Sequence, residues 1–149
     1  MPHSKSELTV VAPNRLKPVD MIATMPHPGF PTDAQAILMA TLLRAKGTSM
    51  IVENIFENRY NHVEELRKMG GCILVSGNTA KIYGVEKLHG ATVRAKDLRA
   101  GAALMIAALC AEGKTVIDDV HHIERGYENM IVKLRSLGAK AEILPKTEL

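Results

Sequence analysis

Aromatic residues, cysteines and long apolar runs are scarce in this sequence, and each shortage excludes a class of protein. Aromatic residues make up 3% of the 149 residues and Trp is absent, which argues against single-strand nucleic-acid binders and β-sandwiches and favours an aliphatic α/β core. Cys72 and Cys110 are too few for a disulfide framework. The longest uncharged apolar run, Ala100 to Ala111, is far shorter than the roughly 20 residues that cross a bilayer. Because the first five residues also lack a secretory apolar stretch, we expect a cytoplasmic protein without a membrane span.

The sequence also lacks a large excess of charge of either sign. The sequence has 19 Lys and Arg residues against 16 Asp and Glu residues, a net charge of +3, and the two signs are interleaved. Long nucleic acids require a dense positive stripe, so we expect no nucleic-acid partner, whereas small anions remain candidate ligands. With 46% hydrophobic residues, a chain of this length supports one core, and we expect one domain.

The chain repeats one supersecondary unit. In the first half the apolar patterns predict strands at 19–24 and 49–54, helices at 34–46 and 61–69, and a hairpin that turns at Gly77 and Asn78. In the second half they predict strands at 92–95, 115–119 and 140–144 and helices at 98–111 and 127–137. A glycine follows each helix, as is typical of a helix end. An offset of 66 residues places Gly47 on Gly113 and Arg59 on Arg125. We therefore predict an α/β fold of two tandem units, about 17–86 and 90–149, after an N-terminal extension of residues 1–16.

Four charged residues lie at predicted strand-to-helix junctions, namely Asp33, Arg59, Arg99 and Arg125. Helix N-termini direct free N–H groups and a partial positive charge to that edge, where α/β proteins bind ligands. Under the same offset, Asp33 falls on Arg99. If the units pack side by side in the same orientation, one carboxylate and three guanidinium groups meet. We expect an anion site with its own base.

Each of these residues also has a purely structural interpretation. Thr32, Asp33 and Gln35 fit a capping box, which makes Asp33 an ordinary helix-start acid, and Asp97 fits a plain N-cap. Arg99 and Arg125 are predicted in first helical turns, where a cation is unfavourable by roughly 0.3–1 kcal/mol unless an anion binds there, although exposed arginines are common. Guanidinium groups suit carboxylate and phosphate because they donate two parallel hydrogen bonds. Both interpretations stay open at this point.

No metal or thiol site is predicted. His121 and His122 are adjacent in what we expect to be extended chain, which places their side chains on opposite faces, and no His, Cys or acidic residues have metal-ligand spacing. Cys110 is expected in the core on an apolar helix, and Cys72 opens a strand without a basic neighbour, so neither is a candidate nucleophile. Gly70 and Gly71 do not form a dinucleotide-binding fingerprint. We predict no metal and no cofactor.

Four short motifs, taken as a set, are more specific than any one of them. They are Pro28-Gly29-Phe30-Pro31-Thr32-Asp33, Phe56-Glu57-Asn58-Arg59, Asp97-Leu98-Arg99-Ala100 and Arg125-Gly126-Tyr127-Glu128. In order and spacing the set resembles the C-terminal portion of the UDP-N-acetylglucosamine 1-carboxyvinyltransferase family, from Lys17 onward. The resemblance implies an inside-out α/β barrel built of βαβαββ units. It also implies a cytoplasmic enzyme that transfers enolpyruvyl from phosphoenolpyruvate to the 3-hydroxyl of UDP-N-acetylglucosamine and releases phosphate, the first committed step of peptidoglycan synthesis.

The resemblance also implies residue roles. Asp33 matches an aspartate that contacts the sugar hydroxyl and takes its proton, and Asp97 matches an acid near the reacting carbons. Ile55 matches a position that lines the nucleotide-sugar site. Arg59 and Arg99 match arginines around the phosphoenolpyruvate carboxylate and the reaction centre, and Arg125 matches one that holds the phosphate. The implied catalytic residues are thus Asp33, Asp97 and Arg99, and the implied substrate-binding residues are Asp33, Ile55, Arg59, Arg99 and Arg125.

Members of that family are much longer than this chain. The resemblance implies that their mobile loop with a catalytic Cys, a Lys-Asn pair and a further phosphate-binding Arg belong to segments that this sequence does not contain. We therefore expect the chain alone to be inactive and to bind its substrates weakly. The inner helix faces, within 36–43 or 103–109, would lack a third partner, which predicts self-association. The alternatives are the sibling shikimate-pathway enolpyruvyl transferase and a non-catalytic α/β binding or folding module.

Overall fold

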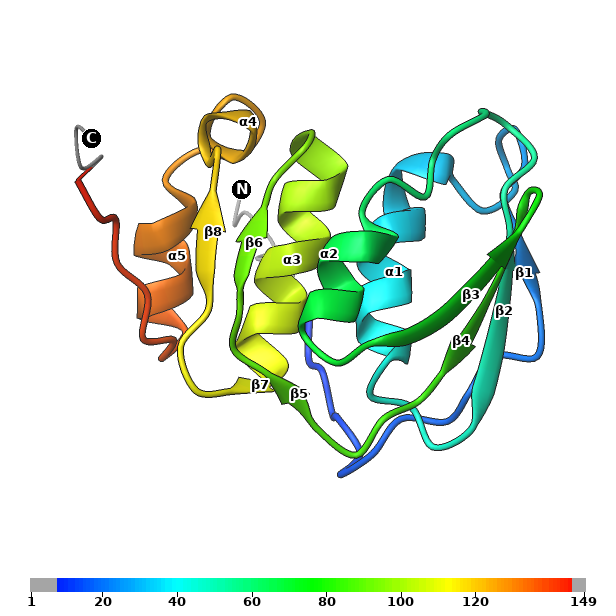
Figure 1. Ribbon diagram of the computed structural model, residues 1–149, viewed down its shortest axis with the longest axis horizontal. Coiled ribbons are helices and arrows are strands. Elements are labelled where there is room, and N and C mark those ends of the chain that lie inside the picture. Colours follow the sequence, from blue (N-terminus) through cyan, green and yellow to red (C-terminus); the bar gives the residue numbers. More distant parts are fainter. Residues whose placement is uncertain (1–7, 146–149) are drawn as a thin grey trace, which may run out of the picture.

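The first repeated unit has the element order βαβαββ (Figure 1). The structure is a computed structural model that describes residues 8–145, so the predicted extension at 1–16 lies partly outside the described residues. The elements of the unit are β1 (Ile22–Ala23), the 3-10 helix η1 (Thr32–Ala34), α1 (Gln35–Leu42), β2 (Thr48–Val52), α2 (Val63–Lys68), β3 (Cys72–Ser76) and β4 (Thr79–Tyr83). They form a sheet in the order β1-β2-β4-β3, in which β1 is parallel to β2 and the hairpin strands are antiparallel to their neighbours. The predicted order of elements is confirmed.

The second unit starts in the same way. Its elements are β6 (Thr92–Arg94), α3 (Leu98–Cys110), β8 (Val116–Asp118), α4 (His121–Glu124) and α5 (Met130–Ser136). β6 pairs in parallel with β8, so β6, α3 and β8 form a βαβ unit. Two further short strands, β5 (Leu88–His89) and β7 (Ala111–Glu112), pair in parallel beside it. The two units therefore share their βαβ part.

The end of the second unit differs from the prediction. No strand forms at 140–144, and the described residues provide no strand partner there. Instead the Ala139 N–H donates to the Leu134 carbonyl, and Arg135 Nε donates to the Ala141 carbonyl at 2.5 Å. The predicted helix at 127–137 begins only at Met130, because Asn129 before it has a left-handed φ of 51°.

The histidine pair also differs from the prediction. His121 and His122 lie in α4 rather than in an extended segment, and their ring centroids are 4.0 Å apart. Their side chains therefore do not point to opposite faces. Asp119 has a positive φ of 58°, which turns the chain from β8 into this helix.

Local sequence explains why the first sheet forms. Ser49 and Ile51 alternate with less buried residues along β2, and Ala80 and Ile82 do so along β4, as expected for strands with one face on the core. The glycines that follow the four predicted helices all have positive φ. Gly70 and Gly138 directly follow the C-cap residues of α2 and α5, as predicted, whereas Gly113 follows β7. Gly84 permits a close approach after the hairpin, since a Cβ there would lie 1.7 Å from the Ala45 carbonyl oxygen.

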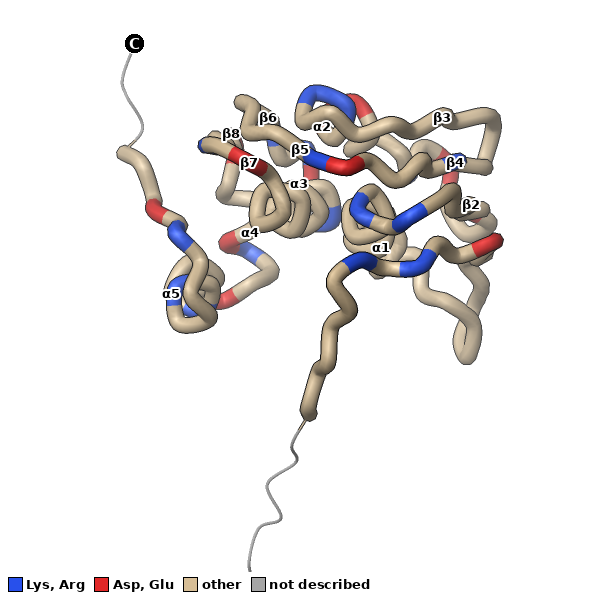
Figure 2. Tube along the Cα trace, turned by 90° about the horizontal axis from the view of Figure 1, so that it is seen from below, with Lys and Arg blue, Asp and Glu red and all other residues tan. Residues whose placement is uncertain are grey.

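The core joins the two units. α1 and α3 pack against each other, and Figure 2 shows them side by side along one side of the strands. Met39 and Leu43 from the first unit and Ala103 and Leu104 from the second are fully buried in one cluster. A smaller cluster around Met105 holds α5 on the outer side of α3.

Some expectations about exposure are corrected by this packing. Cys110 is exposed at the last turn of α3 and is not a core residue. Most of the helix faces expected to lack a partner are buried between α1 and α3, including Ala36, Ala40 and Ala107. Within residues 8–145, no helix has both the length and the apolar character needed to span a membrane.

Candidate functional site

Three strand-to-helix junctions converge on one cleft. They are the turn into η1 and α1, the turn before α2, and the start of α3, which lie at the same end of the molecule in Figure 1. The cleft has a volume of about 220 Å³. It is lined by Thr32, Gln35, Ala36, Glu57, Asn58, Arg59, Asn61, His62, Asp97 and Arg99. The residues come from both units, so the site exists only because the units pack together.

Asp33 and two arginines form an ion cluster beside this cleft. Arg99 Nε donates to Asp33 Oδ1 at 2.5 Å, and Arg59 Nη1 lies 4.0 Å from the same oxygen. The Asp33 side chain is 68% exposed, whereas those of Arg99 and Arg59 are 36% and 23% exposed. Asp33 and Arg99 hold equivalent positions in the two units and contact each other. The predicted meeting of a carboxylate with guanidinium groups is confirmed for these three residues.

An aromatic ring orients Arg59. The guanidinium carbon of Arg59 lies 4.3 Å from the centroid of the Phe56 ring, a cation–π contact. Both residues belong to the turn between β2 and α2. The contact directs the guanidinium toward Asp33 without neutralising it, so its charge remains for an anion.

Asp97 is the N-cap of α3. Its Oδ1 accepts the Ala100 N–H at 2.8 Å and its Oδ2 accepts Asn61 Nδ2 at 2.9 Å, which confirms the capping interpretation. Burial raises the pKa of the Asp97 carboxyl, but these hydrogen bonds outweigh it and hold the pKa below its usual value. Thr32 does not act as the predicted capping residue, because no side chain caps η1 or α1.

Sequence reasoning missed two buried polar residues in the lining of the cleft. His62 and Gln35 are each 1% exposed, and among residues 8–145 neither His62 Nε2 nor the Gln35 amide has a hydrogen-bond partner within 3.5 Å. Burial lowers the pKa of His62 to about 4, although the neighbouring Asp97 carboxylate raises it in part. His62 is therefore neutral near pH 7. No spacing in the sequence singles out His62, because a lone His carries no pattern.

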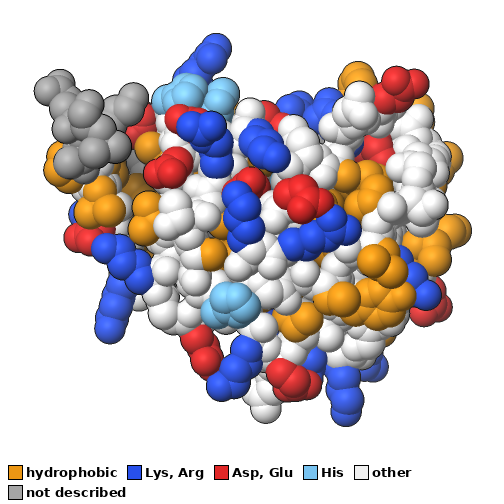
Figure 3. Space-filling model, viewed as in Figure 1, with side chains coloured by type: hydrophobic (Ala, Val, Ile, Leu, Met, Phe, Trp, Pro, Cys, Tyr) orange, Lys and Arg blue, Asp and Glu red, His pale blue; other side chains and the backbone are white. Residues whose placement is uncertain are grey.

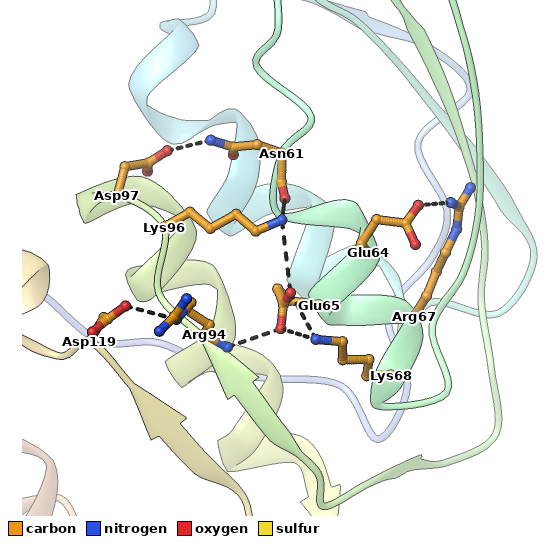
Figure 4. A network of polar contacts seen from close by, with 9 residues as sticks. All are labelled: Asn61, Glu64, Glu65, Arg67, Lys68, Arg94, Lys96, Asp97 and Asp119. Atoms are coloured by element: carbon orange, nitrogen blue, oxygen red, sulfur yellow. Dashed lines mark hydrogen bonds and ion pairs between the residues drawn. The ribbon is translucent and has the colours of Figure 1, made fainter.

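A network of polar contacts links α2 to the start of α3 (Figure 4). Glu65, whose side chain is 5% exposed, accepts the Arg94 N–H at 2.9 Å and pairs with Lys68 at 2.9 Å and with Lys96 at 3.8 Å. Burial raises the pKa of Glu65, but the Lys68 and Arg94 hydrogen bonds outweigh it and hold the pKa below its usual value. Lys96 also donates to the Asn61 carbonyl at 3.2 Å. The network fixes β6 against α2 next to Asp97.

Charges of both signs cover this face. Figure 3 shows basic side chains interleaved with acidic ones over the middle of the view. Arg94 Nε, for example, lies 2.8 Å from Asp119 Oδ2. The surface between α2 and β6 is therefore locally neutralised, in contrast to the two arginines that share Asp33.

Arg125 and Ile55 do not line the cleft. Arg125 follows α4 as its C-cap rather than opening a helix, so the expected conflict with a helix N-terminus does not exist. It is exposed and has no ion pair with any residue in 8–145. Ile55 is half-buried and donates its N–H to the Glu53 carboxylate at 3.0 Å.

The residues of the described segment offer no metal centre. Among residues 8–145, no group of three or more His, Cys, Asp and Glu side chains is arranged to hold a metal ion. The cleft is instead lined by two acidic residues, Glu57 and Asp97, two guanidinium groups and a neutral imidazole, with the Asp33 carboxylate beside it. Such a set binds anions and transfers protons.

Comparison with known protein structures identifies the class of fold. The enolpyruvyl transferase NikO from Streptomyces tendae has a TM-score of 0.77 and 32% identity, over 85% of this chain and 29% of that chain. An EPSP synthase from Acinetobacter baumannii has a TM-score of 0.60 at 22% identity, over 75% of this chain and 27% of that chain, a likeness of fold alone. The fold is therefore that of the enolpyruvyl transferases.

Sequence relatives narrow this class. The family model described as EPSP synthase (3-phosphoshikimate 1-carboxyvinyltransferase) matches residues 2–134, and the chain belongs to that family. The UDP-N-acetylglucosamine 1-carboxyvinyltransferase of Psychrobacter sp. is 59% identical over 128 residues, which are 86% of this chain and 29% of the relative. The corresponding protein 1 of Halalkalibacterium halodurans is 54% identical over 141 residues, which are 95% of this chain and 32% of the relative. This chain thus spans about a third of the length of these relatives.

Proposed function

We propose that this chain is part of a transferase that moves the enolpyruvyl group of phosphoenolpyruvate to the 3-hydroxyl of UDP-N-acetylglucosamine and releases phosphate. The observation that carries the proposal is the Asp33 carboxylate between Arg99 and Arg59 at a cleft formed by both units. Phosphoenolpyruvate carries several negative charges, and two guanidinium groups match its carboxylate and phosphate.

The proposed reaction is an addition followed by an elimination. The acceptor oxygen bonds to C2 of phosphoenolpyruvate while its proton passes to Asp33. C3 takes a proton from the general acid that the family resemblance places on a segment outside this sequence. A proton then leaves C3, the C2–C3 double bond forms again, and phosphate departs from C2. In this scheme Arg59 and Arg99 stabilise the anionic intermediate, and Asp97 supplies negative charge near the reacting carbons. Arg125 as a phosphate ligand and Ile55 as a contact of the nucleotide sugar are proposed from the family resemblance alone, because neither residue lines this cleft.

The acceptor is assigned from the named relatives. Those at 54–59% identity bear the name UDP-N-acetylglucosamine 1-carboxyvinyltransferase, whereas the EPSP synthase likeness is 22% identical. A nucleotide sugar is therefore favoured over a shikimate-type acceptor. We further propose a cytoplasmic location and a role in peptidoglycan synthesis, and no nucleic-acid or membrane partner.

Two proposals concern the chain by itself. Residues 17–149 form one portion with repeated units at about 17–86 and 90–149, and the 149-residue polypeptide alone has no transferase activity because it holds about a third of its relatives' length. A second copy of this chain covers the apolar groove between α3 and α5. Support for the second proposal comes from the groove's lining, which includes Ile106, Met105 and the half-exposed Leu109.

Titration of the purified chain with each ligand, monitored by NMR and by calorimetry, tests the proposed function. We expect phosphoenolpyruvate and UDP-N-acetylglucosamine to bind weakly, with a Kd on the order of millimolar, which corresponds to about −4 kcal/mol. Arg99→Gln should weaken phosphoenolpyruvate binding by about ten- to a hundredfold, because a charged hydrogen bond contributes about 1.5–3 kcal/mol. Arg135→Gln on α5, far from the cleft, is the matched control. Absence of binding by the unmodified chain would favour the non-catalytic module, and equal loss in both variants would contradict the site.

A further inference from the structure

Glu53 is a buried acidic residue to which the proposed reaction assigns no role. It follows β2 directly and is 4% exposed. Its carboxylate accepts four hydrogen bonds. Oε1 accepts from Thr24 Oγ1 at 2.8 Å and from the N–H groups of Ile55 and Phe56 at 3.0 and 3.2 Å, and Oε2 accepts from Thr32 Oγ1 at 2.9 Å.

The four donors belong to three segments that lead into the cleft. Thr24 ends the β1 region, and its hydroxyl also accepts the Asn54 N–H at 2.8 Å. Thr32 opens η1 and immediately precedes Asp33. Ile55 and Phe56 begin the turn that carries Arg59. One carboxylate therefore joins the segment that holds the acid of the site to the segment that holds one of its arginines.

A buried carboxylate such as that of Glu53 requires a compensating benefit. Burying a carboxylate is costly unless several donors satisfy it, and an apolar residue after β2 fills the same space without that cost. The carboxylate, however, orients all four donors at once, and a site is effective when its groups are held in place before the ligand arrives.

We propose that Glu53 is a positioning residue, which fixes η1 with Asp33 against the turn with Arg59 so that the ion cluster has its geometry before a ligand binds. It acts through Thr32 on one side and through the Ile55 and Phe56 N–H groups on the other. One test of this proposal measures ligand affinity and rests on the proposed function. The other is made on the ligand-free protein and does not depend on that function.

Three substitutions separate a positioning role of Glu53 from a role in stability. Thr32→Val matches the shape of threonine and removes only the hydrogen bond to Oε2, at a half-buried position. Thr32→Ser retains the hydroxyl and is its control. Glu53→Gln is the conservative variant, since its carbonyl oxygen can keep the three bonds of Oε1 while its amide donates to the Thr32 hydroxyl.

The ligand-free readout is the NMR signal of the Arg99 Nε–H, which donates to Asp33. We expect Thr32→Val to shift or broaden this signal, and Thr32→Ser and Glu53→Gln to leave it as in the unmodified chain. Thermal unfolding is measured beside it. A signal unchanged by Thr32→Val, or a lower unfolding midpoint with an unchanged signal, overturns the proposal because it reveals a merely structural role.

The ligand readout is the affinity for UDP-N-acetylglucosamine. Thr32→Val should weaken it about three- to tenfold, which corresponds to one hydrogen bond, and Thr32→Ser should restore it. Equal affinities of the Val and Ser variants contradict the proposal. If the unmodified chain binds no ligand, the proposed function fails, and the Arg99 signal alone decides the role of Glu53.

Discussion

The ion pair between Asp33 and Arg99 matters for charge placement more than for folding. Exposed ion pairs contribute about 0–1 kcal/mol to stability, and the Asp33 side chain is largely exposed. The same Asp33 oxygen also lies near Arg59, so one carboxylate stands against two guanidinium groups. Under the proposed function, we expect an incoming anion to compete with Asp33 for these two guanidinium groups.

His62 makes the stability of the protein depend on pH. Its folded pKa is about 4, below the usual 6.5, so the unfolded chain binds a proton that the folded chain rejects. Stability is therefore lost as pH falls below 6.5, and the loss is complete below about 4. We expect the free energy of unfolding to decrease by about 2 kcal/mol between pH 7 and pH 5.

Urea unfolding at the two pH values measures this effect. His62→Asn cannot titrate and serves as the reference, since the usual pKa values of Asp and Glu lie below this window. The variant should lose much less stability than the unmodified protein between pH 7 and pH 5. An equal loss in both proteins would show that His62 is not the responsible group.

The sequence predicted the site residues that are charged and lie at strand-to-helix junctions. It did not predict the polar site residues that are buried. Asp33, Arg59 and Arg99 were found because their positions repeat with the unit. Glu53 and His62 were not found, because a lone acid after a strand and a lone His in a helical turn give no spacing signal. Their roles depend on partners distant in the sequence, such as Thr24 for Glu53 and Asp97 for His62.

At the scale of elements, α3 depends on its cap. Asp97 provides the only side-chain cap among the helices of the described residues, and α3 carries Arg99 and packs against α1. We expect Asp97→Ala to lower the free energy of unfolding by about 1–2 kcal/mol. Asp97→Asn keeps an oxygen for the Ala100 N–H and should cost less than about 0.5 kcal/mol.

Chemical denaturation of the two variants tests this expectation. If the Asn variant is as unstable as the Ala variant, the carboxylate charge rather than the cap stabilises α3. A difference of about 1 kcal/mol in favour of Asn supports capping. Substrate affinity of the Asn variant then reports the electrostatic role of Asp97 separately from its structural role.

The elements of the first unit followed from local patterns, but those at the C-terminal end did not. The alternation in β2 and β4 and the glycines after α2 and α5, Gly70 and Gly138, are local signals that the structure confirms, whereas Gly113 follows the strand β7 rather than a helix. The segment 140–144 has strand-like residues, but a strand exists only when a partner donates hydrogen bonds. α4 was missed because its four residues carry no helical period.

At the scale of the whole molecule, the repeat predicted the packing of the units. Equivalent helices, α1 and α3, form the shared core, and equivalent residues, Asp33 and Arg99, meet at the cleft. Arg125 did not join them, because α4 displaces it from a helix start to a helix end. The internal repeat therefore predicts the contacts that the βαβ parts of the two units make with each other. It does not predict the structure that follows the βαβ part of the second unit.

The groove between α3 and α5 leads to the last prediction, which concerns assembly. Its lining is apolar and includes Ile37, Met105, Ile106 and Leu109, and the Leu109 side chain at its rim is 50% exposed. Leu109→Glu places a charge in any apolar contact made there, so sedimentation should show a monomer for this variant where the unmodified chain forms dimers or larger species. Leu137→Glu, at an 84% exposed position that does not line the groove, should leave assembly unchanged. An unmodified chain that stays monomeric at high concentration would contradict the prediction.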